Sequence, residues 1–122
     1  MIDTIPADVQ RLIRALITQT ERGRLEWQPI DEQATGFLHT SKSGSVSIIS
    51  EDQDGEHPFV FSLLTPEGVR ADSWTSFDKN QGEHSPDAPL LESLYSMAKR
   101  SALGATSLVA DLLDEIEPDI PY

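Results

Sequence analysis

The sequence contains no cysteine in its 122 residues. This absence excludes disulfide frameworks, thiolate zinc sites and cysteine nucleophiles together, and it fits a reducing compartment. No run approaches the roughly 18 apolar residues that a membrane-spanning helix needs. Met1 is followed by Asp3 and Asp8 instead of a basic segment and an apolar run. We therefore expect a cytoplasmic protein that does not bind membranes.

Basic residues are scarce. Nine Lys and Arg stand against 21 Asp and Glu, which gives a net charge of −12. Such a surface repels phosphate backbones and anionic lipid headgroups, because binding to either depends on Lys and Arg. We expect no direct binding of nucleic acid, and the charge favours a basic protein partner. A simpler interpretation stays open, in which acidity only keeps the protein in solution.

Aromatic residues are also few, at 7%, and hydrophobic residues make up 38% of the chain. The apolar residues are nevertheless clustered and periodic, which a disordered chain would not show. The length is that of one ordinary domain. We therefore expect a single α+β domain over residues 1–122.

The first predicted element is a helix over residues 7–22. Pro6 suits the first helical turn, with Asp3 or Thr4 as a candidate cap ahead of it. Gly23 suits the left-handed position after the last turn. An apolar stripe at helical spacing supports this prediction; its members are Val9, Leu12, Ile13, Leu16 and Ile17.

The middle of the chain predicts an antiparallel meander of about four strands. Apolar and β-branched segments are separated there by short turns that contain Asp-Gly or Pro and Gly. The polar residues 77–89 are rich in Gly, Pro, Asp and Ser, so a loop is expected after the last strand. The expected strands are residues 35–40, 45–50, 59–64 and 69–75, with a further short strand at 25–27.

Residues 88–117 hold the longest apolar stripe. Its helical phase continues through Gly104, so one long helix and two helices that meet at Gly104 are both compatible with it. With the first helix it can cover one face of the sheet, which predicts two layers. A continuous helix of about 30 residues would measure about 45 Å, whereas short strands span about 17–20 Å. The end of the stripe should therefore project as a candidate interaction surface: Leu108, Leu112, Leu113 and Ile116.

Carboxylates crowd around Gly55 and form a second candidate interaction surface. A calcium loop with Gly55 at its sixth position would need a carboxylate at its twelfth, where the sequence has Phe61. A charged hairpin turn is therefore the favoured interpretation. The acidic residues of this turn are Glu51, Asp52, Asp54 and Glu56.

Patterns that carry catalysis or bind cofactors are missing. His39, His57 and His84 show no metal-ligand spacing, and we expect them to be solvated in loops or at strand ends. No serine lies in a G-x-S-x-G turn, and the isolated glycines form no phosphate-binding loop. We therefore predict no enzyme activity, no catalytic or metal-binding residues and no cofactor. Trp27 and Trp74 are interpreted as packing residues.

Two short patterns lie near the two ends of the chain. The sequence T-x-x-G-x-L-x-W occupies residues 20–27, and L-Y-x-x-A-K-R occupies residues 94–100. In these patterns the chain resembles a set of small bacterial α+β proteins for which no activity is known. The resemblance spans most of the chain. It implies a shared fold of bacterial, cytosolic type and no catalytic residues.

Three hypotheses for function follow. The first is a non-enzymatic protein-interaction module that binds a basic protein or a second copy as a homodimer, with a role accessory to a bacterial defence or stress system as one candidate. The second is an acidic immunity protein or antitoxin that blocks a basic nuclease, with residues 51–56 and 78–87 imitating phosphates. The third is a small-ligand binder, or an enzyme of unrecognised type, with a pocket between the sheet and the helices.

Overall fold

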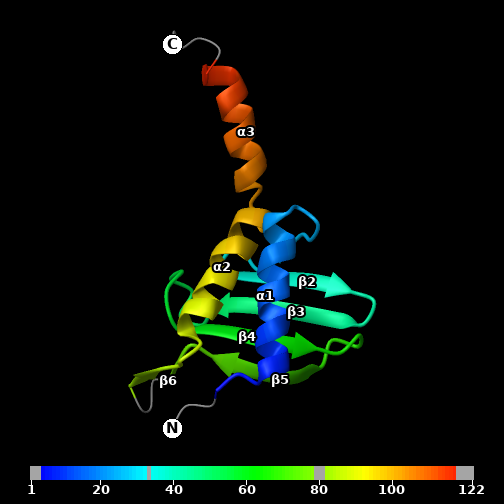
Figure 1. The fold of residues 1–122 in the computed structure, drawn as a ribbon, viewed down its shortest axis with the longest axis vertical. Coiled ribbons are helices and arrows are strands. Elements are labelled where there is room, and N and C mark those ends of the chain that lie inside the picture. Colours follow the sequence, from blue (N-terminus) through cyan, green and yellow to red (C-terminus); the bar gives the residue numbers. More distant parts are fainter. Residues whose placement is uncertain (1–3, 33, 79–81, 118–122) are drawn as a thin grey trace.

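The computed structural model describes residues 4–32, 34–78 and 82–117. The chain has an α+β fold with a five-stranded antiparallel sheet (Figure 1). The prediction of an N-terminal helix, a meander and C-terminal helical structure is confirmed, although the sheet has one more strand than expected. The elements are α1 (Ala7–Glu21), β1 (Gln28–Pro29), β2 (Gly36–Ser41), β3 (Gly44–Ser50), β4 (Phe59–Leu64), β5 (Arg70–Thr75), β6 (Phe77–Asp78), β7 (Glu83–His84), α2 (Ala88–Ala102) and α3 (Ala105–Ile116).

Helix α1 begins at Ala7, as predicted, but Pro6 precedes its first turn instead of lying in it. Pro6 is the N-cap itself, and no side chain caps the helix, so the expected role of Thr4 is not seen. The alternative cap, Asp3, lies outside the described residues. The carbonyl of Pro6 accepts the first helical bond from Gln10 N–H at 2.9 Å. Asp8 in the first turn complements the helix dipole.

The end of α1 is a Schellman motif, as the sequence predicts. Gly23 has φ +70°, a backbone conformation that favours glycine. The N–H groups of Gly23 and Arg24 donate to the carbonyls of Thr20 and Gln19 at 3.1 and 3.0 Å. Three residues of the predicted stripe are buried, Ile17 is half-buried, and Leu12 is exposed at the edge; the buried three are Val9, Ile13 and Leu16.

The five-stranded sheet is a simple meander in the order β1-β2-β3-β4-β5. Its register explains why it needs helices on one face only. Phe37, Ile48 and Phe61 are cross-strand neighbours and are fully buried beneath the helices. The next row along the strands, on the opposite face, is Ser47, Ser62 and Ser73. This row is small and polar, and no helix is needed to cover it, although Ser47 and Ser62 are themselves only 9% and 3% exposed.

The predicted strand at residues 25–27 is wrong by a few residues, since β1 is Gln28–Pro29. The main-chain N–H of Trp27 donates instead to the hydroxyl of Ser101 on α2, at 3.1 Å. The indole of Trp27 is only 3% exposed and donates to Thr20 Oγ1 at 2.9 Å. Trp27 therefore ties α1, α2 and the first strand together, which confirms its role as a packing residue.

The expected loop at residues 77–89 contains a small second sheet. Strands β6 and β7 pair antiparallel, with Phe77 opposite His84. Their rings lie 4.8 Å apart, and Ser85 N–H donates to the carbonyl of Ser76 at 2.8 Å. Two-residue strands are too short to show a periodic pattern, which explains why the sequence predicts only a loop.

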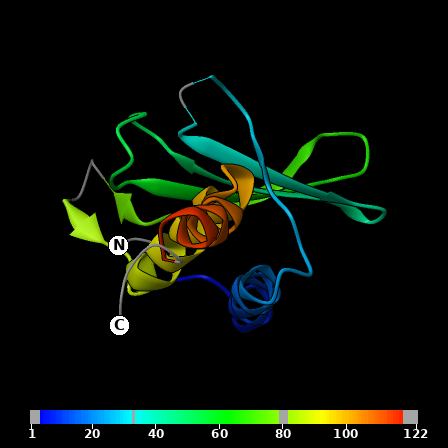
Figure 2. The same cartoon turned by 90° about the horizontal axis from the view of Figure 1, so that it is seen from above.

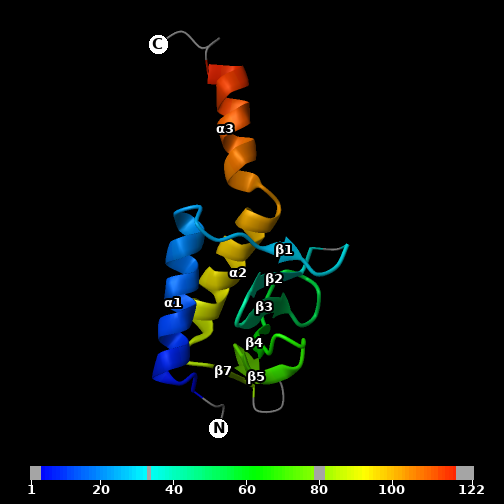
Figure 3. The same cartoon turned by 90° about the vertical axis from the view of Figure 1, so that its right-hand side faces the viewer.

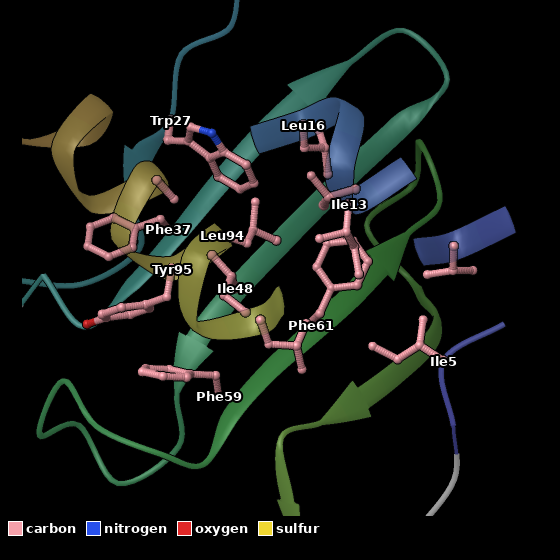
Figure 4. Packing of buried hydrophobic residues seen from close by; sticks show 14 residues of the cluster. Ile5, Ile13, Leu16, Trp27, Phe37, Ile48, Phe59, Phe61, Leu94 and Tyr95 are labelled. Carbon is pink, nitrogen blue, oxygen red and sulfur yellow. The ribbon is translucent and has the colours of Figure 1, made fainter. Parts of the chain in front are cut away.

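The core lies between the sheet and the layer formed by α1 and α2 (Figure 2). Both helices end at the same end of this layer, next to the start of α3 (Figure 1). The ring of Tyr95 lies 4.5 Å from that of Phe59 and 5.5 Å from that of Phe37 (Figure 4). The cluster also contains Ile5, Val9, Ile13, Leu16, Trp27, Val46, Ile48, Phe61, Leu91, Leu94 and Ala98.

The C-terminal helical region is split at Gly104, which decides between the two alternatives that the sequence left open. Gly104 has φ +67°, and α3 starts on its carbonyl with a bond from Leu108 N–H at 2.9 Å. Beyond this residue α3 projects away from the two layers (Figures 1 and 3). Among the described residues, no helix is both long enough and apolar enough to cross a membrane.

Candidate functional site

The projecting helix α3 carries the apolar residues that the sequence singled out, and they face solvent. Leu108 is 56% exposed and Leu112 is 42% exposed. The stripe continues with Val109, which the prediction had not named as a candidate, and Leu103 extends it below Gly104. The other exposed fractions are 48% for Val109, 51% for Leu113, 55% for Ile116 and 49% for Leu103.

The polar side of α3 is acidic. The helix has no acidic residue in its first turn and no basic residue in its last turn. Its charged residues all lie in the second half: Asp111, Asp114 and Glu115. Negative charge near the C-terminal end of a helix is unfavourable in isolation, because the helix dipole places partial negative charge there.

A 12-residue helix is marginal in water unless its apolar face is packed. Helix α2 obtains this packing from the core, where Leu91, Leu94 and Ala98 are fully buried. Every residue of Ser107–Ile116 is exposed. The fold itself therefore supplies no packing for the stripe of α3.

The second predicted surface, residues 51–56, is an ordered acidic loop between β3 and β4. Ser50 organises it, because its hydroxyl accepts from Gly55 N–H at 3.1 Å and donates to the carbonyl of Glu56 at 2.9 Å. Asp54 Oδ1 accepts from Glu56 N–H at 2.9 Å. The side chains of the four acidic residues are exposed: Glu51, Asp52, Asp54 and Glu56.

This loop does not complete a calcium site. Phe61, at the twelfth position of the hypothetical calcium loop, lies fully buried in the core. In the part of the chain that the structure describes, no group of three or more His, Asp or Glu side chains could hold a metal ion. The loop joins two antiparallel neighbouring strands, β3 and β4, so it is a charged hairpin connection, as the sequence favours. Of the other predicted acidic segment, 78–87, residues 79–81 lie outside the described residues.

A polar cluster beside this loop was missed by the sequence analysis. His57 Nδ1 lies 2.7 Å from Ser76 Oγ, and His57 Nε2 lies 3.3 Å from Glu92 Oε2. The ring of His84 lies 5.4 Å from that of His57 in an edge-on arrangement. The prediction that His57 is simply solvated is wrong, because the fold brings it against three separate segments. No local motif marks this cluster.

The order Ser76–His57–Glu92 resembles that of a catalytic triad, but the geometry gives it another role. Ser76 is fully buried, and its hydroxyl accepts a bond from Phe59 N–H at 2.7 Å. A nucleophilic hydroxyl must instead face a substrate. The cluster therefore connects the start of β4 to the start of the small hairpin and to α2.

His39, the third histidine, stands apart from this cluster on β2. It is half-buried, with Nδ1 2.9 Å from the carbonyl of Glu26 and its ring 5.9 Å from that of Trp27. It also lines an open groove of about 450 Å³ between α1 and the sheet. Among the described residues that line this groove, none is a carboxylate, lysine or arginine; its apolar side chains are Leu12, Leu16, Val46, Leu63 and Leu64.

Comparisons with protein-family models, with curated proteins and with solved structures found no match to this chain.

Proposed function

We propose that this chain is a non-enzymatic protein-interaction module that binds its partner through α3. The observation that carries this proposal is the row of large apolar side chains on a helix that projects from the fold. Scattered exposed apolar residues are ordinary, but a contiguous apolar patch on a protruding element is typical of an interface. Helix-in-groove recognition uses this spacing of anchors.

The energetics support the same function. Burying a Leu, Ile or Val side chain completely contributes about 1.5–3 kcal/mol. Five such residues on α3 are each about half exposed. Covering them would contribute on the order of 5 kcal/mol, and a partner would at the same time stabilise a helix that is marginal alone.

Site-specific photo-crosslinking tests this function. A benzophenone amino acid is placed at Leu112 on α3 or, as a matched control, at Val69, which is 62% exposed on the sheet side of the molecule. We expect a discrete protein adduct at position 112 in the cells that make the protein, and none at position 69. Adding Leu108→Asp should abolish the adduct, because it places a charge in the face of α3 that the partner would bury.

Two outcomes would contradict the function. One is the absence of any adduct at position 112. The other is an adduct of equal yield at position 69, which would show unspecific contact. The mass of a specific adduct separates partner types: twice the chain mass indicates a second copy, and any other mass indicates a different protein.

A further inference from the structure

We infer that the partner of α3 is α3 of a second copy, paired antiparallel about a two-fold axis near Ala110 and Asp111. This inference rests on the proposed function and names its partner. It follows from three features of α3 and its surroundings: the order of apolar residues, the position of the charges, and the basic end of the body from which α3 leaves.

The apolar residues of α3 occupy the same positions whether they are counted from the N-terminal or the C-terminal end of the helix. Reversing the helix about its centre exchanges Leu108 with Leu113 and Val109 with Leu112. It also exchanges Ala105 with Ile116, so a small side chain meets a large one. A two-fold interface must be self-complementary in this way, because residue i contacts residue j and j contacts i. In heptad terms, Val109 and Ile116 are a positions and Leu112 is a d position, and antiparallel pairing places a opposite d.

The charges of α3 favour the antiparallel direction. Residues 105–110 carry no charge, whereas the second half contains Asp111, Asp114 and Glu115. Antiparallel pairing places each acidic half beside the neutral half of the other helix. Parallel pairing would place the acidic halves side by side, which is destabilising.

The base of α3 is basic. Arg22 and Arg24 follow the end of α1, and Lys99 and Arg100 lie in the last turn of α2. All four are exposed, and none forms an ion pair with a described residue. They are four of only nine basic residues in the chain. Antiparallel pairing brings the acidic tip of each α3 to this basic end of the other copy.

The shape of the molecule permits this pairing. Helix α3 is about 18 Å long and projects from one end of the two layers (Figure 3), so the two bodies would lie at opposite ends of the helix pair. An interface made mainly by two such helices is smaller than the standard size of about 1,600 Å². A reversible dimer with Kd on the order of micromolar is therefore expected.

Sedimentation velocity from about 1 μM to several hundred μM tests the pairing. The wild-type mass should rise from 13.5 kDa towards twice that value. Leu112→Asp should stay monomeric, and the control Val69→Asp should behave like the wild type. A monomeric wild-type chain throughout this range would overturn the inference, as would a Leu112→Asp variant that dimerises like the wild type.

Because the chain has no native cysteine, engineered cysteines can test directly whether the two α3 helices pair antiparallel. Ala105→Cys mixed with Ile116→Cys should give a mixed disulfide dimer, whereas either variant alone should not, because its two sulfurs would be about 16 Å apart along the axis. Efficient dimers of Ala105→Cys alone would overturn the antiparallel arrangement. If the wild type is monomeric but position 112 still crosslinks to a different protein, the proposed function stands and this inference fails.

Discussion

At the scale of single residues, the structure separates polar groups that hold the fold together from groups that could act outside it. Ser76 belongs to the first kind. Its buried hydroxyl bonds to His57 Nδ1 and Phe59 N–H, which joins the start of β4 to the segment between β5 and β6. The cluster could be mistaken for catalytic machinery from its residue types alone, and only the burial of Ser76 shows that it is structural.

Replacing Ser76 by alanine should therefore destabilise the protein by about 1–3 kcal/mol, since the Phe59 N–H is left buried without a partner. Urea unfolding monitored by tryptophan fluorescence measures this change. Ser93→Ala, at an exposed position of α2, should change the unfolding free energy by less than about 0.5 kcal/mol. Equal effects of the two substitutions would show that the Ser76 hydroxyl is not a structural bond.

Tyr95 presents the opposite case, a buried hydroxyl that has no hydrogen-bond partner among the described residues. Tyr95→Phe should leave the unfolding free energy at pH 8 unchanged or raise it by up to about 1 kcal/mol, because no bond is lost and an unsatisfied group is removed. A loss above about 1 kcal/mol in the same urea experiment would show that the hydroxyl is bonded.

The same residue predicts a pH dependence. Burial raises the pKa of Tyr95 above its ordinary value of 10.0, and the negative charges of Asp31 and Asp54 raise it further. The folded state thus holds the phenol proton more tightly than the unfolded state. This contribution is fully present below pH 10 and is lost as the pH rises through the folded-state pKa. Thermal unfolding between pH 9 and 11.5 should show a steeper loss for the wild type than for Tyr95→Phe; equal slopes would contradict the shift.

At the scale of elements, α2 and α3 show that one apolar pattern can have two different environments. The stripe continues in phase from Leu91 to Ile116, but Gly104 redirects the chain and only α2 reaches the sheet. The spacing predicts both helices well. It cannot predict the direction of α3, because the same sequence is compatible with a left-handed residue at Gly104 and with an uninterrupted helix.

Matched leucines test this difference. Leu94→Ala on α2 should destabilise the protein by about 2–5 kcal/mol, since it removes a fully buried side chain from the core. Leu112→Ala on α3 should cost less than about 0.5 kcal/mol at concentrations where the chain is monomeric. Urea unfolding at low protein concentration checks both values. A large cost at Leu112 would mean that α3 packs on its own body.

Much of the fold could be predicted from local patterns. Helix α1 with its glycine end, strands β2 to β5 and the two-layer class follow from periodicity and turn residues. The hairpin β6–β7 could not, because its strands are only two residues long. The cluster around His57 could not either, since its three hydrogen-bonded residues are separated by 19 and 35 positions along the chain. The exposed residues of α3 were predicted because an apolar stripe longer than its sheet has nothing to cover.

At the scale of the whole molecule, the charge is unevenly distributed. A net charge of −12 coexists with four exposed basic residues around the base of α3. The acidic half of α3 lies at the far end of the same helix. The protein therefore has a basic surface at the base of α3 and an acidic surface at its tip, and in the proposed dimer the tip of one copy contacts the base of the other. Dimer formation should therefore weaken as salt screens the contact between tip and base.

The central claim is that α3 is an interaction helix whose apolar face is covered by a partner, and amide hydrogen exchange tests it most directly. Exchange is measured on the wild-type chain at about 1 μM and at several hundred μM. The account predicts that the amides of Ala105–Ile116 exchange rapidly at the low concentration and are protected at least several-fold at the high one, while those of α2 stay equally protected at both. Strong protection of α3 that does not change with concentration, and that persists in Leu112→Asp, would contradict it.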